Sequence, residues 1–250
     1  MSETDLFSSL SEISTCRIFN ALHFQSSWRR PFSTAKTLKK TFTTADGGRV
    51  SVDTMHIILK CPCWTPEDMG GAKFLEVPFA EGFWKAIFIL PGLTRRFPWM
   101  QKRQHSLEEL TSLLTDVKLA EILKNMRNKV VQEVEIQMPK FRMERNIELC
   151  PILRELGLVT ALDDSADFSE MAETSPFCIN SVLQKVRIDV DEYGTETPPI
   201  NKQLTIMDQM DNFMPYNGEF IADRPFIFLI RHRDLDYIVY MGHVADPSAS

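Results

Sequence analysis

The cysteine residues are the first candidates for chemistry in this sequence of 250 residues. Five are present, and only Cys61 and Cys63 lie close together, separated by Pro62. A zinc site usually combines two such pairs of Cys or His ligands, and no second pair stands nearby. An odd, sparse cysteine count also argues against a disulfide framework. We therefore expect thiols with a structural role, no metal site and no cofactor.

A catalytic site would need a nucleophile with a base and an orienting group within reach. No Gly-x-Ser-x-Gly, His-Glu-x-x-His or Walker sequence is present, so the common motifs that carry such groups are missing. The histidines are scattered along the chain, at His23, His56, His105, His232 and His243. We therefore expect no catalytic residues and do not expect an enzyme.

The composition argues against several classes of protein. The chain is 44% hydrophobic and 25% charged, which rules out wholesale disorder and is sufficient for a large core. A net charge of −6 with both signs interspersed is unfavourable for binding nucleic acid. No apolar run approaches a membrane span, and residues 1–5 are acidic where a secretory signal would be basic. These features favour a cytoplasmic protein with no nucleic-acid or membrane partner.

Alternating apolar residues predict many strands, whereas helical spacing predicts few helices. A capping box from Ser106 to Glu109 begins one helical stretch, and Gly157 ends a second one that starts at Leu149. Strands without regular βαβ alternation indicate an α+β fold with mainly antiparallel sheets. The predicted strands are residues 16–24, a hairpin over 40–56, and 73–79, 83–90, 134–138, 182–190, 225–230 and 237–241.

In two segments the apolar residues follow neither a strand nor a helix periodicity. Residues 1–14 are small and polar and form a lead-in segment. The segment from Gly194 to Gly218 is longer than an ordinary loop. A structureless loop of that length inside a compact domain is usually functional or disordered, so we expect the function to lie there.

Short motifs between about Cys16 and Pro247 follow the order found in one known family, and through them the chain resembles the serpins, a superfamily of protease inhibitors. Each motif is weakly specific alone, but their shared order covers nearly the whole chain. In chain order they are Asn20-Ala21-Leu22-His23-Phe24 with Trp28 and Pro31-Phe32, Leu75-Glu76-Val77-Pro78-Phe79, Leu90-Pro91, Met138-Pro139-Lys140-Phe141, Leu156-Gly157-Leu158, Ala166-Asp167-Phe168-Ser169, Asp191-Glu192-Tyr193-Gly194-Thr195-Glu196, Arg224-Pro225-Phe226-Ile227-Phe228 and Gly242-His243-Val244-Ala245-Asp246-Pro247.

The resemblance implies a serpin-like α+β fold with mainly antiparallel sheets, a few helices and an exposed reactive-centre loop at about residues 192–219. It also implies that the serpin domain, residues 15–250, is truncated and lacks the N-terminal helices of the family, which leaves an extracellular location open. In the family, a protease attacks the loop and forms an acyl-enzyme, and the freed loop inserts as a new strand into sheet A. Here an open slot for it would lie between the strands at 16–24 and 184–190.

The resemblance assigns the hinge of the loop to Glu192, Tyr193, Gly194, Thr195, Glu196 and Thr197. Beyond this hinge the family usually has small residues, whereas this chain has Pro198 and Pro199. Proline lacks an N–H donor and fixes φ, so these two residues cannot complete the ladder of a central strand. The two prolines therefore predict that the cleaved loop inserts poorly as a new strand into sheet A.

Family spacing from the hinge places the scissile bond between Asp208 and Gln209. An aspartate there suggests a serine protease or a caspase-like cysteine protease whose pocket offers a cation. The alternative interpretation of Asp208 is a solvated loop acid. Other candidates for the bait position are Met207, Met210 and Met214.

Three functions therefore stay open. The first is a serpin-like inhibitor that acts on a target protease as a suicide substrate. The second is a non-inhibitory, serpin-derived binding protein, and the third is an incomplete fragment that folds only with a missing half. Uncovered sheet edges would also favour self-association.

Overall fold

The computed structural model describes residues 16–94, 103–126, 128–171, 178–195, 217–235 and 237–249. The chain divides into two compact units, Met1–His23 with Met143–Arg187, and Phe24–Arg142 with Ile188–Ser250. Within the described ranges, no helix is both long and apolar enough to cross a lipid bilayer.

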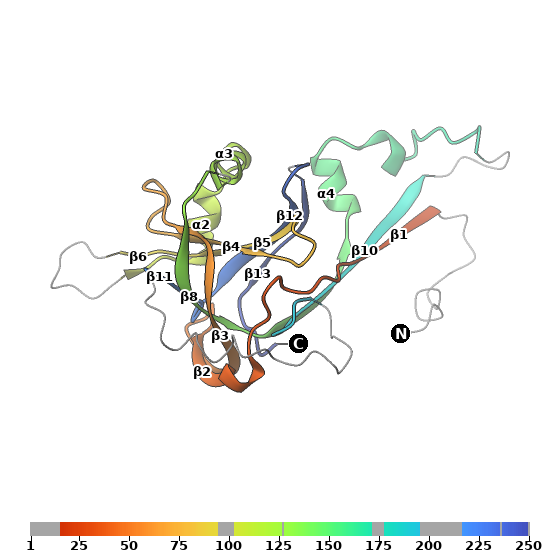
Figure 1. Cartoon of the computed structure of the whole chain (residues 1–250). Coiled ribbons are helices and arrows are strands. Elements are labelled where there is room, and N and C mark those ends of the chain that lie inside the picture. Colours follow the sequence, from red (N-terminus) through yellow and green to blue (C-terminus); the bar gives the residue numbers. More distant parts are fainter. Residues whose placement is uncertain are drawn as a thin grey trace. The chain divides into compact units, whose positions relative to one another are not determined.

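The sheet of the first unit has three strands in the order β1 (Cys16–His23), β10 (Ile179–Val190) and β9 (Phe141–Glu148). β1 and β10 pair in parallel, from Cys16 opposite Ile179 to His23 opposite Arg187, and Figure 1 shows them side by side. These are the two strands that we expected to flank an open slot. They are hydrogen-bonded to each other, so the expectation of an open slot is wrong for this structure. A further strand could enter only after the two separate.

A short helix and a 3-10 turn complete the first unit. The helix predicted from Leu149 is α4 (Cys150–Glu155), and the 3-10 turn η2 covers Thr160–Leu162. Gly157 follows the helix with φ +94°, a left-handed conformation that ends helices and favours glycine. Cys150, Leu162 and Val182 form a small buried core.

The larger sheet of the second unit has the strand order β11-β8-β3-β4-β5-β12-β13, and β2 pairs with β3 outside this path. Its described pairs are antiparallel except for β11 with β8, as predicted. β3 is 16 residues long, so it pairs with three strands in succession, with β2 over residues 49–54, with β8 over residues 54–62 and with β4 over residues 63–64. The strands are β2 (Leu38–Thr43), β3 (Arg49–Trp64), β4 (Lys73–Pro78), β5 (Trp84–Leu90), β8 (Val131–Pro139), β11 (Gly218–Ile221), β12 (Phe226–His232) and β13 (Ile238–Val244).

Three short elements complete the second unit. The 3-10 turn η1 (Thr34–Lys36) precedes β2. β6 (Leu93–Thr94) and β7 (Arg103–Gln104) pair as a small sheet of their own.

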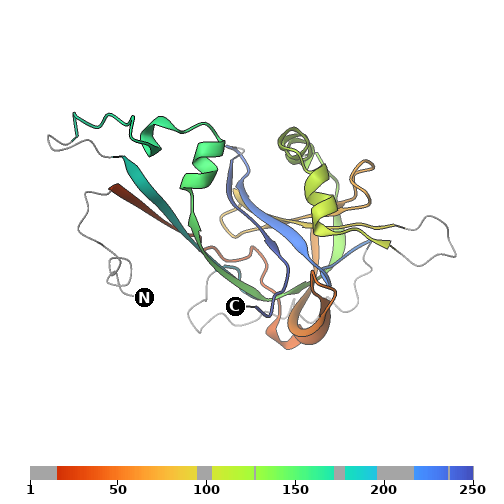
Figure 2. The ribbon, with the colours of Figure 1, turned by 180° about the vertical axis from the view of Figure 1, so that it is seen from behind.

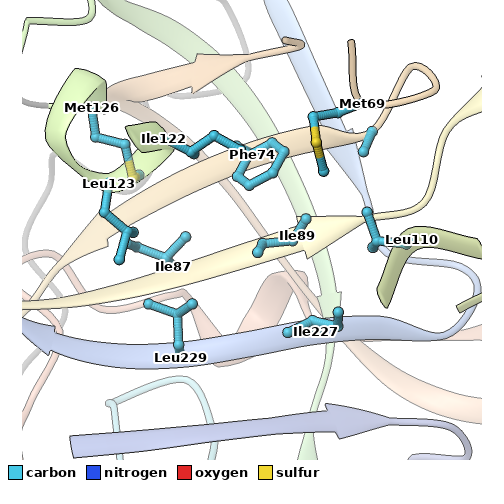
Figure 3. Close-up of a cluster of buried hydrophobic side chains, with 11 residues drawn as sticks. Met69, Phe74, Ile87, Ile89, Leu110, Ile122, Leu123, Met126, Ile227 and Leu229 are labelled. Carbon is cyan, nitrogen blue, oxygen red and sulfur yellow. The ribbon is translucent and has the colours of Figure 1, made fainter. Parts of the chain in front are cut away.

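Helices α2 (Leu107–Leu113) and α3 (Asp116–Met126) lie on one face of the larger sheet (Figures 1 and 2). Because residues two apart on a strand share a face, Ile87 and Ile89 of β5 both point toward the helices. The buried cluster between the layers is shown in Figure 3 and holds the second unit together. Its members are Met69, Ala72, Phe74, Ile87, Ile89, Leu110, Ile122, Leu123, Met126, Ile227 and Leu229.

The predicted capping box is confirmed at the start of α2. Ser106 Oγ accepts a hydrogen bond from the Glu109 amide at 3.0 Å, and Glu109 Oε2 accepts one from the Ser106 amide at 3.2 Å. The helical stretch that follows is two helices, because Thr115 interrupts it. The Thr115 hydroxyl accepts a hydrogen bond from the Lys118 amide at 3.2 Å and so caps the start of α3.

Candidate functional site

The predicted site residues fall into two groups. Glu192, Tyr193, Gly194 and Thr195 are described and lie directly after β10. The remaining residues of the predicted loop that carry its hinge and bait roles lie outside the described residues: Glu196, Thr197, Pro198, Pro199, Met207, Asp208, Gln209, Met210 and Met214. The candidate site is therefore the described part of the predicted hinge, Glu192–Thr195, together with Asp191 before it, and from here on the hinge means these residues, 191–195.

A tight turn forms the hinge. The Asp191 amide donates a hydrogen bond to the Gly194 carbonyl at 3.0 Å. Asp191 Oδ1 accepts hydrogen bonds from the amides of Tyr193 at 2.8 Å and Gly194 at 3.3 Å. An aspartate that caps the amides just after it is typical of Asx turns, so the side chain of Asp191 holds the turn together.

Backbone hydrogen bonds dock this turn against residues 26–28. The Trp28 amide donates to the Tyr193 carbonyl at 2.7 Å, and the Thr195 amide donates to the Ser26 carbonyl at 2.9 Å. The Thr195 hydroxyl in turn accepts a hydrogen bond from the Ser26 amide at 3.0 Å. The first residues of the predicted loop are therefore already paired with another segment of the chain.

Gly194 is required at the closest approach of these two segments. It has φ +143°, and a Cβ atom added there would lie 2.2 Å from the Ser26 carbonyl oxygen. Real Cβ atoms do not come so close to backbone oxygen, so every other residue type would push the hinge away from residues 26–28.

Glu192 is the buried charge of the hinge. Its Oε2 lies 2.9 Å from Lys140 Nζ, and its Oε1 accepts a hydrogen bond from the Thr37 hydroxyl at 2.7 Å. Its backbone carbonyl accepts one from the Phe32 amide at 2.8 Å. Burial raises the pKa of Glu192, but the hydrogen bonds from Lys140 and Thr37 outweigh burial and leave the pKa below its ordinary value. Glu192 is thus ionised, and its carboxylate links the hinge to Thr37, just before β2, and to Lys140, between β8 and β9.

Trp28 supports the hinge from the core side. Its ring is 2% exposed and stacks on Phe79 with the ring centroids 4.6 Å apart. Its Nε1–H donates a hydrogen bond to the Asp191 carbonyl at 2.9 Å. Because the ring of Trp28 is packed in the core, its Nε1–H group has a fixed position.

Strand β11 anchors the C-terminal end of the predicted loop. β11 pairs in parallel with β8, from Gly218 opposite Val134 to Ile221 opposite Gln137. Lys73 Nζ also donates a hydrogen bond to the Glu219 carbonyl at 3.0 Å. The described residues on either side of 196–216 are therefore both fixed by contacts within the second unit.

Sequence patterns did not single out the side chains of Thr37 and Lys140, or the backbone of Ser26, as partners of the hinge. Lys140 stands in one of the family-like motifs, but nothing in that motif indicated that it pairs with Glu192. Periodicity could not have indicated this pair, because the two residues are distant in sequence and their contact follows no repeat of apolar positions.

The other chemistry-bearing residues do not assemble into a site. Within residues 16–94, 103–126, 128–171, 178–195, 217–235 and 237–249, no three His, Cys, Asp or Glu side chains are arranged to hold a metal ion. Cys61 and Cys63 are buried on β3, and burial raises the pKa of Cys63 to about 11. These thiols are protonated at neutral pH and are poor nucleophiles.

Comparison with known proteins agrees with the resemblance seen in the sequence motifs. A family model described as "Serpin (serine protease inhibitor)" matches residues 4–247. Human Serpin B11 is 27% identical over 235 residues, which cover 92% of this chain and 55% of that protein. The leukocyte elastase inhibitor of Sus scrofa is 28% identical over 230 residues, 92% of this chain and 58% of that protein.

The fold is also that of solved relatives. The serpin structure from the trematode Schistosoma haematobium aligns with a TM-score of 0.74 at 23% identity, covering 92% of this chain and 56% of that one. The chain thus spans about half the length of the curated relatives that it matches.

Proposed function

Because the chain belongs to the serpin family, whose members are generally protease inhibitors and not enzymes, we propose that it inhibits a protease as a suicide substrate through the segment between β10 and β11. In this mechanism the catalytic chemistry is that of the protease. Its nucleophile attacks the scissile carbonyl, the peptide bond breaks, the new amine leaves, and an acyl-enzyme remains.

The docked hinge is the observation that carries the proposal. Gly194 and Glu192 hold the start of the loop at the end of β10, which is the strand that pairs in parallel with β1. A cleaved loop that folds back at this hinge would run antiparallel to β10, between it and β1. It would replace one parallel ladder by two antiparallel ones, a pairing that is slightly more stable per residue, and this gain would drive the conformational change.

The bond between Asp208 and Gln209 is the proposed site of attack. An aspartate before the scissile bond suits a protease whose specificity pocket holds an arginine, because carboxylate and guanidinium form paired, charge-assisted hydrogen bonds. This favours an Asp-directed serine protease or a caspase-like cysteine protease as partner. Met207, Met210 and Met214 remain the alternative bait residues.

A non-inhibitory binding protein is the second candidate function, and Pro198 and Pro199 favour it. If these residues prevent insertion, the acyl-enzyme has time to hydrolyse and the chain is cleaved as an ordinary substrate. Each lost ladder bond would cost about 1–3 kcal/mol where its partner is buried and left unpaired.

Incubation of the full chain with a caspase and with a granzyme B-type protease tests the proposal. We expect a covalent complex that survives denaturing electrophoresis, and its formation should be lost in Asp208→Asn. Asp211→Asn is the matched control, since it removes an acid from the same segment without touching the proposed bond. Cleavage without a complex would support the second function, and no reaction with either protease would contradict both the Asp-directed site and the proposed partner class.

A further inference from the structure

Helix α4 of the first unit is apolar on two sides. Leu149, Cys150 and Leu153 pack in the small core of this unit. Ile152 and Leu156 are four residues apart and therefore lie on one side of the helical turn, and both are exposed. A helix at a protein surface ordinarily has polar residues on its outer side. The outer side of α4 is therefore unusual for a surface that meets only water.

The turn after α4 adds two more exposed apolar side chains. The Gly157 amide donates a hydrogen bond to the Arg154 carbonyl at 3.0 Å, and the Leu158 amide donates one to the Leu153 carbonyl at 2.9 Å. This pair of bonds is the Schellman motif, which fixes the path of the chain as it leaves a helix. Leu158 and the next residue, Val159, are both exposed. The four exposed apolar residues, which we call the α4 surface, are Ile152, Leu156, Leu158 and Val159.

The exposure of the α4 surface suggests a binding role. Single exposed hydrophobic residues are normal on a folded protein, whereas a group of adjacent ones marks an interaction site. The four residues lie within eight consecutive positions, and the side chain of Leu156 is 77% exposed. Because hydrogen bonds fix the backbone of this turn, a partner would meet an ordered surface and would not have to order it on binding.

The charges around the α4 surface are mainly negative. Residues 150–171 contain five acidic residues and a single basic one, Arg154. Nη2 of Arg154 donates a hydrogen bond to the Leu162 carbonyl at 3.0 Å, so this cation is held against the backbone. Glu155 lies within α4, and Asp163 and Asp164 directly follow the 3-10 turn η2. Arg154 attracts Asp163, which places this acid close to α4. The α4 surface thus combines apolar side chains with a negative surrounding.

We propose that the α4 surface binds a partner protein through a basic segment that has apolar side chains between its lysines or arginines. The apolar side chains of the partner would cover the α4 surface, and its cations would face the neighbouring acids. Complementary charge selects the partner and speeds its approach, and an amphipathic helix with apolar residues at helical spacing is a common form of such a segment. This inference does not rest on the proposed inhibition, which concerns the segment between β10 and β11.

Fluorescence anisotropy with the full chain and a labelled peptide tests the inference. The probe is a peptide of about 15 residues that contains only leucine and lysine, with the leucines at helical spacing. We expect it to bind, and we expect a matched peptide with glutamate in place of lysine to bind at least about tenfold more weakly. Binding of the lysine peptide should also weaken as the salt concentration rises from about 0.05 M to about 0.5 M.

Variants of exposed residues locate the bound peptide. Leu156→Gln should weaken binding by about tenfold or more, because the burial of one leucine side chain corresponds to at least a factor of ten in affinity. Leu235→Gln is the matched control and should leave binding unchanged, since Leu235 is 66% exposed but lies between β12 and β13 in the second unit. Asp163→Asn with Asp164→Asn should weaken binding by about twofold to tenfold and reduce its dependence on salt.

Several results would overturn the inference. The first is that the lysine peptide does not bind, or binds no better than the glutamate peptide. The second is that Leu156→Gln binds as tightly as the unaltered chain, or that Leu235→Gln loses as much affinity. The third comes from sedimentation of the full chain alone, since a dimer that Leu156→Gln dissociates would make a second copy of this chain the occupant. Because no protease is present, a failure of this inference and a failure of the proposed inhibition can be told apart.

Discussion

Glu192 and Lys140 are unequal partners in their ion pair, because the Glu192 side chain is 5% exposed and that of Lys140 is 40% exposed. Without the lysine, a buried carboxylate would keep only Thr37 as a side-chain donor. Without the acid, the lysine could turn to water. We therefore expect Lys140→Met to lower the free energy of unfolding by about 2–4 kcal/mol and Glu192→Gln by about 1–2 kcal/mol, measured by denaturant unfolding.

Lys39→Met is the matched control for this comparison. Lys39 forms an ion pair with Asp53, but the two side chains are 67% and 53% exposed. An exposed pair contributes at most about 1 kcal/mol. If Lys140→Met were no more destabilising than Lys39→Met, the ion pair between Glu192 and Lys140 would not stabilise the hinge.

Gly194 is the residue at which a single methyl group should disturb the hinge most. Its added Cβ would lie 2.2 Å from the Ser26 carbonyl oxygen, whereas Gly82 also has a positive φ but nothing within 4 Å of such an atom. We expect Gly194→Ala to cost about 3 kcal/mol or more, and Gly82→Ala about 1 kcal/mol from the backbone conformation alone. Thermal unfolding of the two variants checks this order. Equal losses of stability would contradict the close approach of Gly194 to the Ser26 carbonyl oxygen.

At the scale of elements, we expect Pro198 and Pro199, beyond the hinge, to oppose the formation of a new strand between β1 and β10. Pro198→Ala with Pro199→Ala restores two N–H donors and frees φ. We expect this double variant to shift the products of a protease reaction from cleaved chain toward covalent complex, as measured by densitometry of denaturing gels. Pro215→Ala, beyond the proposed scissile bond, should leave the ratio unchanged. Unchanged products in the double variant would show that the prolines do not limit insertion.

Most of the strands that sequence patterns predicted have a clear burial period or an apolar run, although β1 has neither. β5 is a nearly continuous apolar segment and is buried along most of its length, and β8 alternates as expected. β9 was not predicted, since its sequence Phe-Arg-Met-Glu-Arg-Asn-Ile-Glu has polar residues on both faces and only Phe141 is buried. Its strand conformation comes from pairing in a sheet with distant segments, which no local pattern reports.

At the scale of the molecule, the family could be inferred from motif order, but the contacts that residues 191–195 make could not. Thr37 follows the 3-10 turn before β2, and Lys140 lies between β8 and β9, so only the folded second unit brings them to Glu192. Periodicity identifies buried faces but does not assign a particular cation to a particular acid.

The proposed inhibition requires that the segment after the hinge can enter the sheet that contains β1 and β10. Thermal unfolding before and after a single cleavage within residues 196–216 tests it most directly. Insertion of a new strand would raise the unfolding temperature by at least about 10 °C, which corresponds to several kcal/mol for a chain of this size. An unchanged or lower unfolding temperature after complete cleavage would contradict the claim.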